Sequence, residues 1–533
     1  MALGTIASRV TGFGRTAVLT FALGTGILGD AYNTANVIPF IVYDLLLGGI
    51  LQSIVVPILV RRRKADRDGG VGYEQRLFTL VTLALLVITL AAIAVAGPLL
   101  AIYVHDPVKH ELTTIFARYL LAQIFFIGIS GLFSAMLNTR GRFAAPMWSP
   151  VLNNLVILAV GVAFLAVTGG DATAESVTPG EIVLLGVGTV GGMMAQVLAL
   201  LVAVHRAGFR WRPRFDFRSM NLAEIGKLAT WSVVYLFVFQ AGYAVTANLA
   251  NRAGSDAVAE GLGYGAGFTP YNNAYQLFQL PYAIIAVSVI TALLPRMSEH
   301  ASDGRNDLLR GDFGQGLRLS SALIVPASLL MAALAPSITV LLFSYFNTST
   351  ADAAYIGEVL AVFALGLVPF TVFQLLLRVF YAMHDTRTPA LVAFANVAVN
   401  AGVGVLAYTL LPAGHAVTGL AAGFGLQYVV GSVIAWLVMS RRTGGLGGRA
   451  ITSTIARLYL ASVPGLIFAF AMSLAFTTLF GTGRLQALLS LAVGGGIGML
   501  LFVIFARALR VTEVTSLLDT VRAKLPGRRG GTR

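Results

Sequence analysis

The chain has 533 residues, a mean hydropathy of +0.81 and only 11% charged residues, whereas a soluble protein carries about 25%. It has no cysteine, which excludes disulfides, thiolate metal sites and a cysteine nucleophile. The formal net charge of +14 lies mostly in short loops between apolar runs, so it favours contact with anionic headgroups over nucleic-acid binding.

Apolar runs long enough to cross a hydrocarbon layer of ~30 Å follow one another along almost the whole chain. They predict an all-α polytopic membrane protein with about fourteen transmembrane helices. The predicted spans are 2–27, 30–60, 77–104, 112–138, 146–168, 181–204, 221–251, 262–295, 317–346, 352–383, 388–411, 416–440, 450–480 and 485–506. The first span contains Arg9 and Arg15 and lacks a basic n-region, so it is expected to be retained.

The first two spans carry charges at depths where a charge costs about 2.5–3.5 kcal/mol unless it meets a partner or a wet cavity. Arg9 and Arg15 are separated by about 120° of helical rotation, so both can line one broad face. Asp30 and Asp44 are close to four turns apart and lie nearly on one stripe of the second span, to which Tyr43 adds polarity. This span is therefore expected to face a cavity or other protein.

Each of these charges also has a purely structural interpretation. Arg9 and Arg15 could snorkel to the membrane surface, and Asp30 could be a simple helix cap. Asp44 could pair with an arginine without any role in binding. Pro39 in the second span and Pro281 in the eighth each remove a helical hydrogen bond, which predicts kinks and candidate gates at corresponding places.

The loops between spans alternate in charge. Of the 37 Lys and Arg, 28 fall on one side of the predicted membrane, three on the other and six within spans. This split is a strong positive-inside signal and predicts that both termini are cytoplasmic. The chain is thus expected to lie in the cytoplasmic (inner) membrane as a multi-pass protein.

An internal repeat divides the spans. Residues 133–140 (FSAMLNTR) at the end of the fourth span match residues 380–387 (FYAMHDTR) at the end of the tenth at five of eight positions. An offset of six spans keeps orientation, which predicts two parallel six-helix repeats around a central cavity, plus two C-terminal helices. The predicted domains are 1–220, 221–445, 446–510 for the two additional helices, and 511–533 for a basic cytoplasmic tail. Convergence of two helix ends on similar loop chemistry is the alternative.

Chemistry typical of membrane enzymes and ATP-driven pumps is missing. The six histidines fall in loops or near span ends without metal-ligand spacing, and no glycine-rich phosphate loop with a following lysine is present. We therefore predict no catalytic residues, no metal and no cofactor, and a transporter rather than an enzyme.

Several segments resemble the MurJ/MviN family of lipid II flippases, within the MOP transporter superfamily. They are residues 7–15 (ASRVTGFGR), 29–32 (GDAY) with Pro39, 279–282 (QLPY) with 294–296 (LPR), and 380–389 (FYAMHDTRTP). The resemblance covers about residues 2–510. It implies alternating-access transfer of an undecaprenyl-pyrophosphate-linked peptidoglycan precursor from the inner to the outer leaflet.

The resemblance also implies functional positions. Arg9, Arg15 and Asp30 match cavity residues of the family, and an arginine fork suits a pyrophosphate. Tyr43 and Gln276 stand where the family often has further arginines, so the cavity would be less cationic. With Asp44, these six form the predicted substrate-binding cavity.

The implied partners are lipid II and membrane lipids, with cell-wall synthesis or division proteins as further candidates and no nucleic acid. Two rivals remain open. One is an exporter of another polyprenyl-linked oligosaccharide or of drugs. The other is a non-transporting paralogue that scaffolds cell-wall synthesis, which the Tyr43 and Gln276 departures suggest.

Overall fold

The computed structural model describes residues 2–45, 59, 62, 68–217, 222–516 and 519. This part of the chain is built from helices joined by turns and contains no strand. Its contacts divide the chain into two compact units. Unit 1 comprises Met1–Asn272, Tyr345–Asp352 and Tyr408–Val417; unit 2 comprises Asn273–Ser344, Ala353–Ala407 and Thr418–Arg533.

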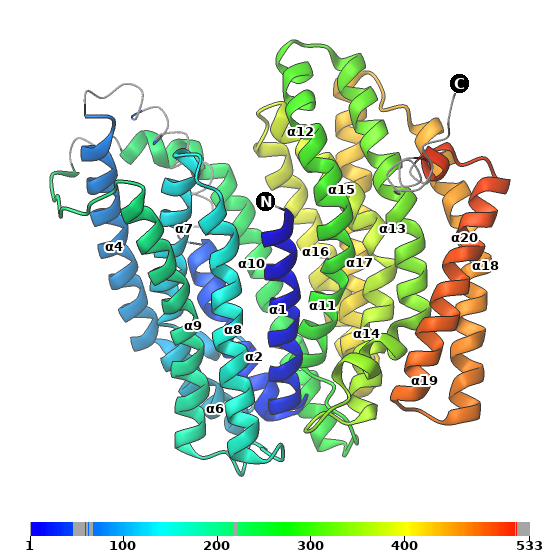
Figure 1. The fold of residues 1–533 in the computed structure, drawn as a ribbon, viewed down its shortest axis with the longest axis horizontal. Helices are drawn as coiled ribbons and strands as arrows, with labels where there is room; N and C mark the ends of the chain where they lie inside the picture. The colour runs from blue at the N-terminus through cyan, green and yellow to red at the C-terminus, as the bar shows by residue number, and fades with distance from the viewer. Residues whose placement is uncertain are drawn as a thin grey trace, which may run out of the picture. The chain divides into compact units, whose positions relative to one another are not determined.

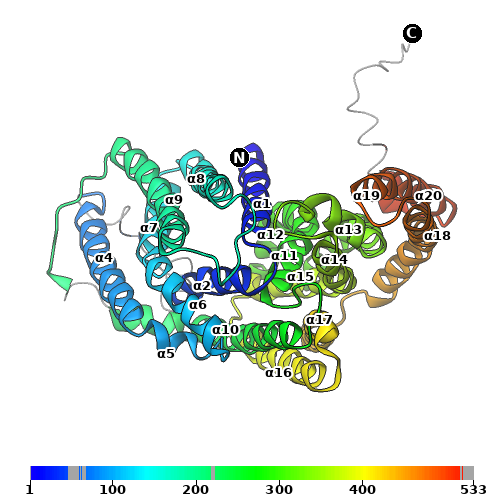
Figure 2. The same cartoon turned by 90° about the horizontal axis from the view of Figure 1, so that it is seen from below.

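The helices of unit 1 pack mostly against helices that are distant in the chain. They are α1 (Ala2–Leu23), α2 (Ile27–Tyr43), α4 (Val71–Ala94), α5 (Ala96–Leu100), α6 (Pro107–Leu120), α7 (Gln123–Thr139), α8 (Ala144–Thr168), α9 (Pro179–Arg206) and α10 (Leu222–Ala259). Helix α1 lies beside α8, α8 beside α9, and α9 beside α7 and α6, whereas α2 lies against α6 (Figure 1; Figure 2).

Local sequence signals explain where these helices begin. Asp106 caps α6 by accepting a hydrogen bond from the backbone N–H of Lys109, and Pro107 occupies the first helical turn. Thr178 and Glu181 form a reciprocal capping box at the start of α9. Close approach of helices is made possible by glycine: a Cβ on Gly128 of α7 would lie 2.3 Å from a side-chain carbon of α4.

Unit 2 is organised along the 38-residue helix α13. Its elements are η4 (Tyr282–Ala286), α12 (Val287–Ser302), α13 (Asn306–Phe343), α15 (Leu367–Ala382), α16 (Arg387–Leu410), α17 (Ala413–Thr443), α18 (Gly448–Phe480), α19 (Arg484–Leu489), η5 (Ser490–Gly495) and α20 (Gly496–Ala508). Helices α11 (Phe268–Pro281) and α14 (Thr350–Leu365) begin within unit 1 and continue into unit 2, and α16 and α17 meet within unit 1.

The two additional C-terminal helices pack against α13. Ala469 of α18 joins Ala333 and Leu334 of α13 in a buried apolar cluster. Helices α18 and α20 meet through glycine, because a Cβ on Gly465 would lie 2.3 Å from the carbonyl oxygen of Gly498. Small residues therefore hold the last helices in place, as in other membrane bundles.

The structure confirms the prediction of an all-α polytopic membrane protein. Each predicted span coincides with helix in the described residues, but the count of about fourteen is not confirmed. Eleven described helices are long and apolar enough to cross a membrane, or twelve if α14 and α15, bent by 48°, form one span. Helices α1, with its two arginines, and α2, described over 17 residues, are not among them.

The predicted division into six-helix repeats stays a prediction, because compact units reflect contacts rather than repeat symmetry. Parts of three predicted segments lie outside the described residues. These are most of the second half of the 30–60 span, residue 221 at the start of the 221–251 span, and most of the basic tail, 511–533.

Candidate functional site

The two arginines of α1 lie in different surroundings. Arg9 is exposed and Arg15 is half-buried. Helix α1 meets α8 through Asn154, whose Nδ2 donates to the carbonyl of Ser8 (3.0 Å) and to Oγ1 of Thr11 (3.2 Å). Arg15 lies four residues after Thr11 and seven after Ser8, so it shares the side of α1 that contacts α8. Arg9 directly follows Ser8 and is rotated from it by about 100° around the helix. Their joint role in a cavity stays a prediction.

Asp30 is the centre of a buried ion pair in unit 1. Its Oδ2 accepts a hydrogen bond from Nζ of Lys109 at 2.7 Å, and the two side chains are 2% and 1% exposed. Lys109 Nζ also donates to the backbone carbonyl of Asn251 (3.1 Å), and Asp30 Oδ1 accepts from the backbone N–H of Thr269 (2.6 Å). The carboxylate thus joins α2, α6, α10 and the start of α11.

Glycine backbone encloses this carboxylate. A Cβ on Gly267 would lie 2.0 Å from Oδ2 of Asp30, and one on Gly254 would lie 2.8 Å from the same atom. Side chains at either position would displace Asp30. The surroundings therefore fit a carboxylate that is held firmly, with its negative charge balanced by Lys109 and by the amino terminus of α11.

Lys109 falls between the predicted spans 77–104 and 112–138, which makes it a loop residue, so the sequence does not predict this pair. Lys109 lies instead in the first turn of α6, directly after the Asp106 cap. An Asp-Pro pair is a typical helix-start signal, and applied here it predicts a helix that begins at Pro107 and includes Lys109. Nothing local indicates Asp30 as its partner, since 79 residues separate them. Asp30 is not the cap of its own helix, because Gly26 occupies that position.

The remaining polar residues of α2 bind neighbouring helices. Tyr32 hydrogen-bonds Thr189 of α9 at 2.7 Å. Asn33 donates to Thr269 of α11 at 3.1 Å. Asn36 accepts from Gln123 of α7 at 3.0 Å, and Thr34 and Asn251 exchange hydrogen bonds. The sequence predicts that α2 faces a cavity or other protein, and these four polar residues face neighbouring helices.

The second half of the predicted 30–60 span is described only in part. Pro39 is buried inside α2, which continues helically through it to Tyr43. Tyr43 and Asp44 are half-buried and lie where α2 gives way to π-helical residues. Their predicted place in a substrate cavity, and the predicted hinge at Pro39, are not tested by this geometry.

Pro281 lies at a change of helix type in unit 2. It ends α11, and the π-helix η4 follows it directly before α12 resumes the α-helical pattern. A π-segment after proline is a recognised cause of local bending and is common at functional sites. Gln276, five residues earlier in α11, is half-buried. The predicted hinge at Pro281 therefore coincides with an irregular helix.

A polar pocket of about 340 Å³ borders the buried ion pair and was not foreseen. Its lining residues are Val104, His105, Asp106, Asn251, Arg252, Ser255, Asp256 and Tyr408. Tyr408 donates to Asp256 at 2.8 Å, and the ring Nδ1 of His105 meets the Asn248 amide at 3.2 Å. Burial, then the charge of Arg252 and nearby His110, lowers the pKa of His105 below its usual value, so its ring is neutral at pH 7.

Long apolar helices, two arginines on α1 and a buried ion pair between α2 and α6 define a class of protein: a multi-pass α-helical membrane protein with charged residues among its helices. Solved structures agree on the fold. One titled "Lipid II flippase MurJ, inward closed conformation" aligns with a TM-score of 0.73 at 17% identity, over 96% of this chain and 100% of that one. An inward-facing multidrug resistance MATE family transporter of the MOP superfamily aligns with a TM-score of 0.65 at 15% identity, over 83% and 96%.

Sequence relatives define the family more narrowly. The family model described as lipid II flippase MurJ matches residues 19–501. A probable lipid II flippase MurJ of Rhizobium meliloti (strain 1021) is 26% identical over 81% of this chain and 79% of its own length. The lipid II flippase MurJ of Burkholderia cenocepacia is 26% identical over 82% of each. The chain belongs to the lipid II flippase MurJ family, whose members are named as transporters rather than enzymes.

Proposed function

We propose that this protein moves lipid II, the polyprenyl-pyrophosphate-linked peptidoglycan precursor, from the inner to the outer leaflet. The observation that carries the proposal is the family match over residues 19–501 of a chain built from apolar helices. Alternating access through rocking of helical repeats would expose a polar site to each side in turn. The lipid tail would stay in the bilayer while the headgroup crosses.

In this proposal Arg9 and Arg15 bind the pyrophosphate. A guanidinium presents a planar fork of donors that matches phosphate oxygens, and neither arginine has a carboxylate partner in the described residues. Tyr43, Asp44 and Gln276 are proposed to contact the uncharged parts of the headgroup. Pro39 and Pro281 are proposed hinges.

Asp30 has a different role in this proposal. With 2% exposure and both oxygens occupied, its carboxylate supports transport by holding Lys109 and the start of α11. It would act as a positioning residue in the state described here and not as a ligand of the cargo.

The direct test is transfer of fluorescent lipid II between leaflets of proteoliposomes. We expect wild-type protein to transfer it, and Arg9→Gln and Arg15→Gln each to slow transfer at least about tenfold, since one lost charge-assisted hydrogen bond is worth roughly 1.5–3 kcal/mol. Arg212→Gln, an exposed loop arginine, is the matched control. Normal transfer by both α1 variants would remove the arginines from the mechanism.

The MATE-like fold supports one rival cargo, since drugs are named for that neighbour. Competition of lipid II transfer by other polyprenyl-linked oligosaccharides and by cationic drugs separates the possibilities. A scaffold without transport would leave growth intact when Arg9 and Arg15 are replaced in cells that depend on this protein. Cell-wall synthesis or division proteins are proposed partners in either case.

We further propose an inner-membrane location with cytoplasmic termini. Because the chain has no cysteine, single cysteines report topology without background. A membrane-impermeant maleimide should label Ser176→Cys, in the exposed α8–α9 loop, on intact spheroplasts. Ser302→Cys, exposed at the end of α12, should react only after permeabilisation. The reverse pattern would invert the proposed topology.

A further inference from the structure

A second cleft lies in unit 1, away from the ion pair at Asp30. It has a volume of about 690 Å³ and opens between the end of α7, the start of α8 and the end of α9. Its lining residues are Leu137, Gly141, Arg142, Phe143, Ala144, Ala145, Met147, Trp148, Ala199, Val202, Ala203 and Arg206. The volume falls in the usual range for small-molecule sites.

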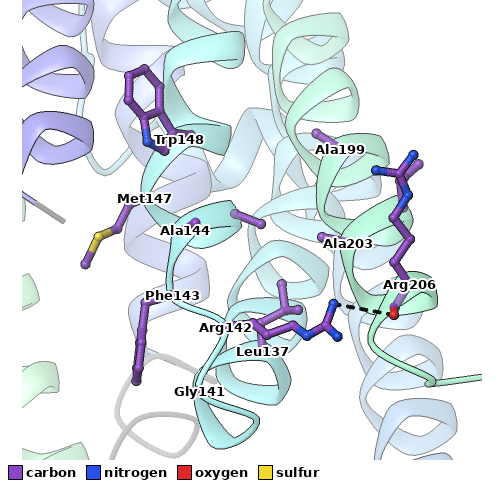
Figure 3. A pocket seen from close by; sticks show the side chains of 12 residues that line it. Leu137, Gly141, Arg142, Phe143, Ala144, Met147, Trp148, Ala199, Ala203 and Arg206 are labelled. Atoms are coloured by element: carbon purple, nitrogen blue, oxygen red, sulfur yellow. Dashed lines mark hydrogen bonds between the residues drawn. The ribbon is translucent and has the colours of Figure 1, made fainter.

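The charge of this lining is entirely positive. Arg142 and Arg206 are its only ionisable residues, and both are exposed. Among the residues that the structure describes, no carboxylate lies within ion-pair distance of either guanidinium. Within the described part of the chain, Arg142 donates one hydrogen bond, from Nη1 to the carbonyl of Arg206 at 3.4 Å (Figure 3). Each guanidinium therefore keeps donors for an anion.

The rest of the lining is apolar and includes aromatic side chains. Trp148 and Phe143 are 52% and 38% exposed, and Val202 is 50% exposed. Figure 3 shows Phe143, Met147 and Trp148 on the α8 side of the cleft and Ala199, Ala203 and Arg206 on the α9 side, with Arg142 reaching between them. Aromatic side chains beside arginines are typical of the zone where lipid headgroups meet the hydrocarbon layer.

The helices that form the cleft also present apolar surface beyond it. Only 28% of the most apolar window of α8 and 33% of that of α9 is buried within the protein. Exposed leucines continue along both helices from the cleft, at Leu152 and Leu155 of α8 and Leu198 and Leu201 of α9. An occupant with a charged end in the cleft could lay a hydrocarbon chain along this surface.

We propose that this cleft binds an anionic phospholipid. The phosphodiester would lie between Arg142 and Arg206, and an acyl chain would follow the apolar faces of α8 and α9. The net negative charge matters, because a zwitterionic headgroup carries its own ammonium to neutralise the phosphate. The site is separate from lipid II transport and would couple the protein to the charge of its leaflet.

The test measures lipid retention by native mass spectrometry of purified protein with added phosphatidylglycerol or phosphatidylcholine. Wild type should retain one tightly bound phosphatidylglycerol and no equivalent phosphatidylcholine. Arg142→Gln/Arg206→Gln should weaken phosphatidylglycerol binding at least about tenfold, since each basic residue near an anionic surface adds attraction. Arg142→Lys/Arg206→Lys keeps the charges and should retain part of the binding, which excludes misfolding as the cause.

The matched control is Arg212→Gln/Arg449→Gln, which removes two exposed arginines outside the cleft. Equal loss of binding in this control would show a general charge effect and overturn the site. Full competition by inorganic phosphate, or by polyprenyl pyrophosphate, would also overturn the proposal, because the cleft would then hold a free anion or the transported lipid.

A second readout uses Trp148 itself. In a variant with Trp148 as the only tryptophan, phosphatidylglycerol with brominated acyl chains should quench its fluorescence more than brominated phosphatidylcholine does. That difference should vanish in the Arg142→Gln/Arg206→Gln background. Equal quenching by both lipids in the otherwise unaltered protein would contradict a site selective for anionic lipid.

Discussion

Two ion pairs of this protein each join an aspartate to a basic side chain, but they differ in how deeply they are buried. Asp30 and Lys109 of unit 1 are 2% and 1% exposed. Asp385 and Arg442 of unit 2 lie at helix ends and are 16% and 43% exposed. Removal of one partner should be costly in the first pair, because it leaves a buried charge, and cheap in the second, where water replaces the partner.

The largest effect is expected from breaking the Asp30–Lys109 pair. Asp30→Asn or Lys109→Gln should each lower the free energy of unfolding by about 3–5 kcal/mol, since the remaining charge stays buried. The double variant Asp30→Asn/Lys109→Gln leaves no net charge and should cost clearly less than the sum. Denaturation in detergent micelles measures all three. Additive losses would mean that the two residues do not stabilise each other.

The next largest effect should come from the glycine that encloses the same carboxylate. Gly267→Ala puts a methyl group 2.0 Å from Oδ2 of Asp30 and should destabilise by about 1–3 kcal/mol. Gly263→Ala is the matched control, because its Cβ would meet nothing within 4 Å. If the two alanine variants unfold at the same temperature, the carboxylate has room to move and is not held as described.

An ion pair of intermediate burial tests the trend between these extremes. Glu74 of α4 is 3% exposed and pairs with Arg140, 11% exposed, at the end of α7. Glu74→Gln keeps the shape and removes the charge, so we expect a loss of about 1–3 kcal/mol. Arg76→Gln, which breaks the more exposed pair with Asp216, should change stability by less than about 1 kcal/mol. A larger loss from Arg76→Gln would contradict burial as the controlling variable.

The positions of the helices can be predicted from the sequence, but the partners in these ion pairs cannot. A helix that crosses a membrane needs about twenty apolar residues in one run, so hydropathy predicts it locally. Caps such as Asp106-Pro107 refine where a helix begins. The partner of Asp30 lies 79 residues away, and its choice depends on how α2, α6 and α10 pack. No sequence periodicity indicates that choice, so hydropathy alone predicts Lys109 to be a loop residue between two spans.

The two segments of the predicted repeat also show that similar sequence does not determine ion-pair partners. Residues 133–140 and 380–387 match at five of eight positions, yet their charges find different partners. Arg140 of the first segment pairs with Glu74, whereas Asp385 of the second, where the first has Asn138, pairs with Arg442. The helix ends differ as well, because α7 continues to Thr139 whereas α15 ends at Ala382, before the matching threonine, Thr386. Similar sequence at the two positions therefore fixes neither the helix end nor its ion pair, which depends on the neighbouring helix in each unit.

The smallest loss of stability is expected from replacement of Asp385, and this loss should depend on pH. Burial alone would raise the pKa of Asp385, but hydrogen bonds from Thr388 and Arg442 outweigh it and hold the pKa below its usual value. A depressed pKa contributes stability that is fully present above the unfolded pKa of about 3.9 and is lost as pH falls through the folded pKa.

Asp385→Asn should therefore cost less than about 1 kcal/mol at pH 7, because the Arg442 side chain is 43% exposed and stays in contact with water, and the difference from wild type should be constant from pH 7 to about pH 5. Below about pH 4 the two proteins should converge in melting temperature, since protonation removes the same interaction from wild type. A difference that grows on acidification would mean that the neutral carboxyl is the stabilising form. The pair at the helix end would then resemble a buried site, and the contrast with Asp30 and Lys109 would fail.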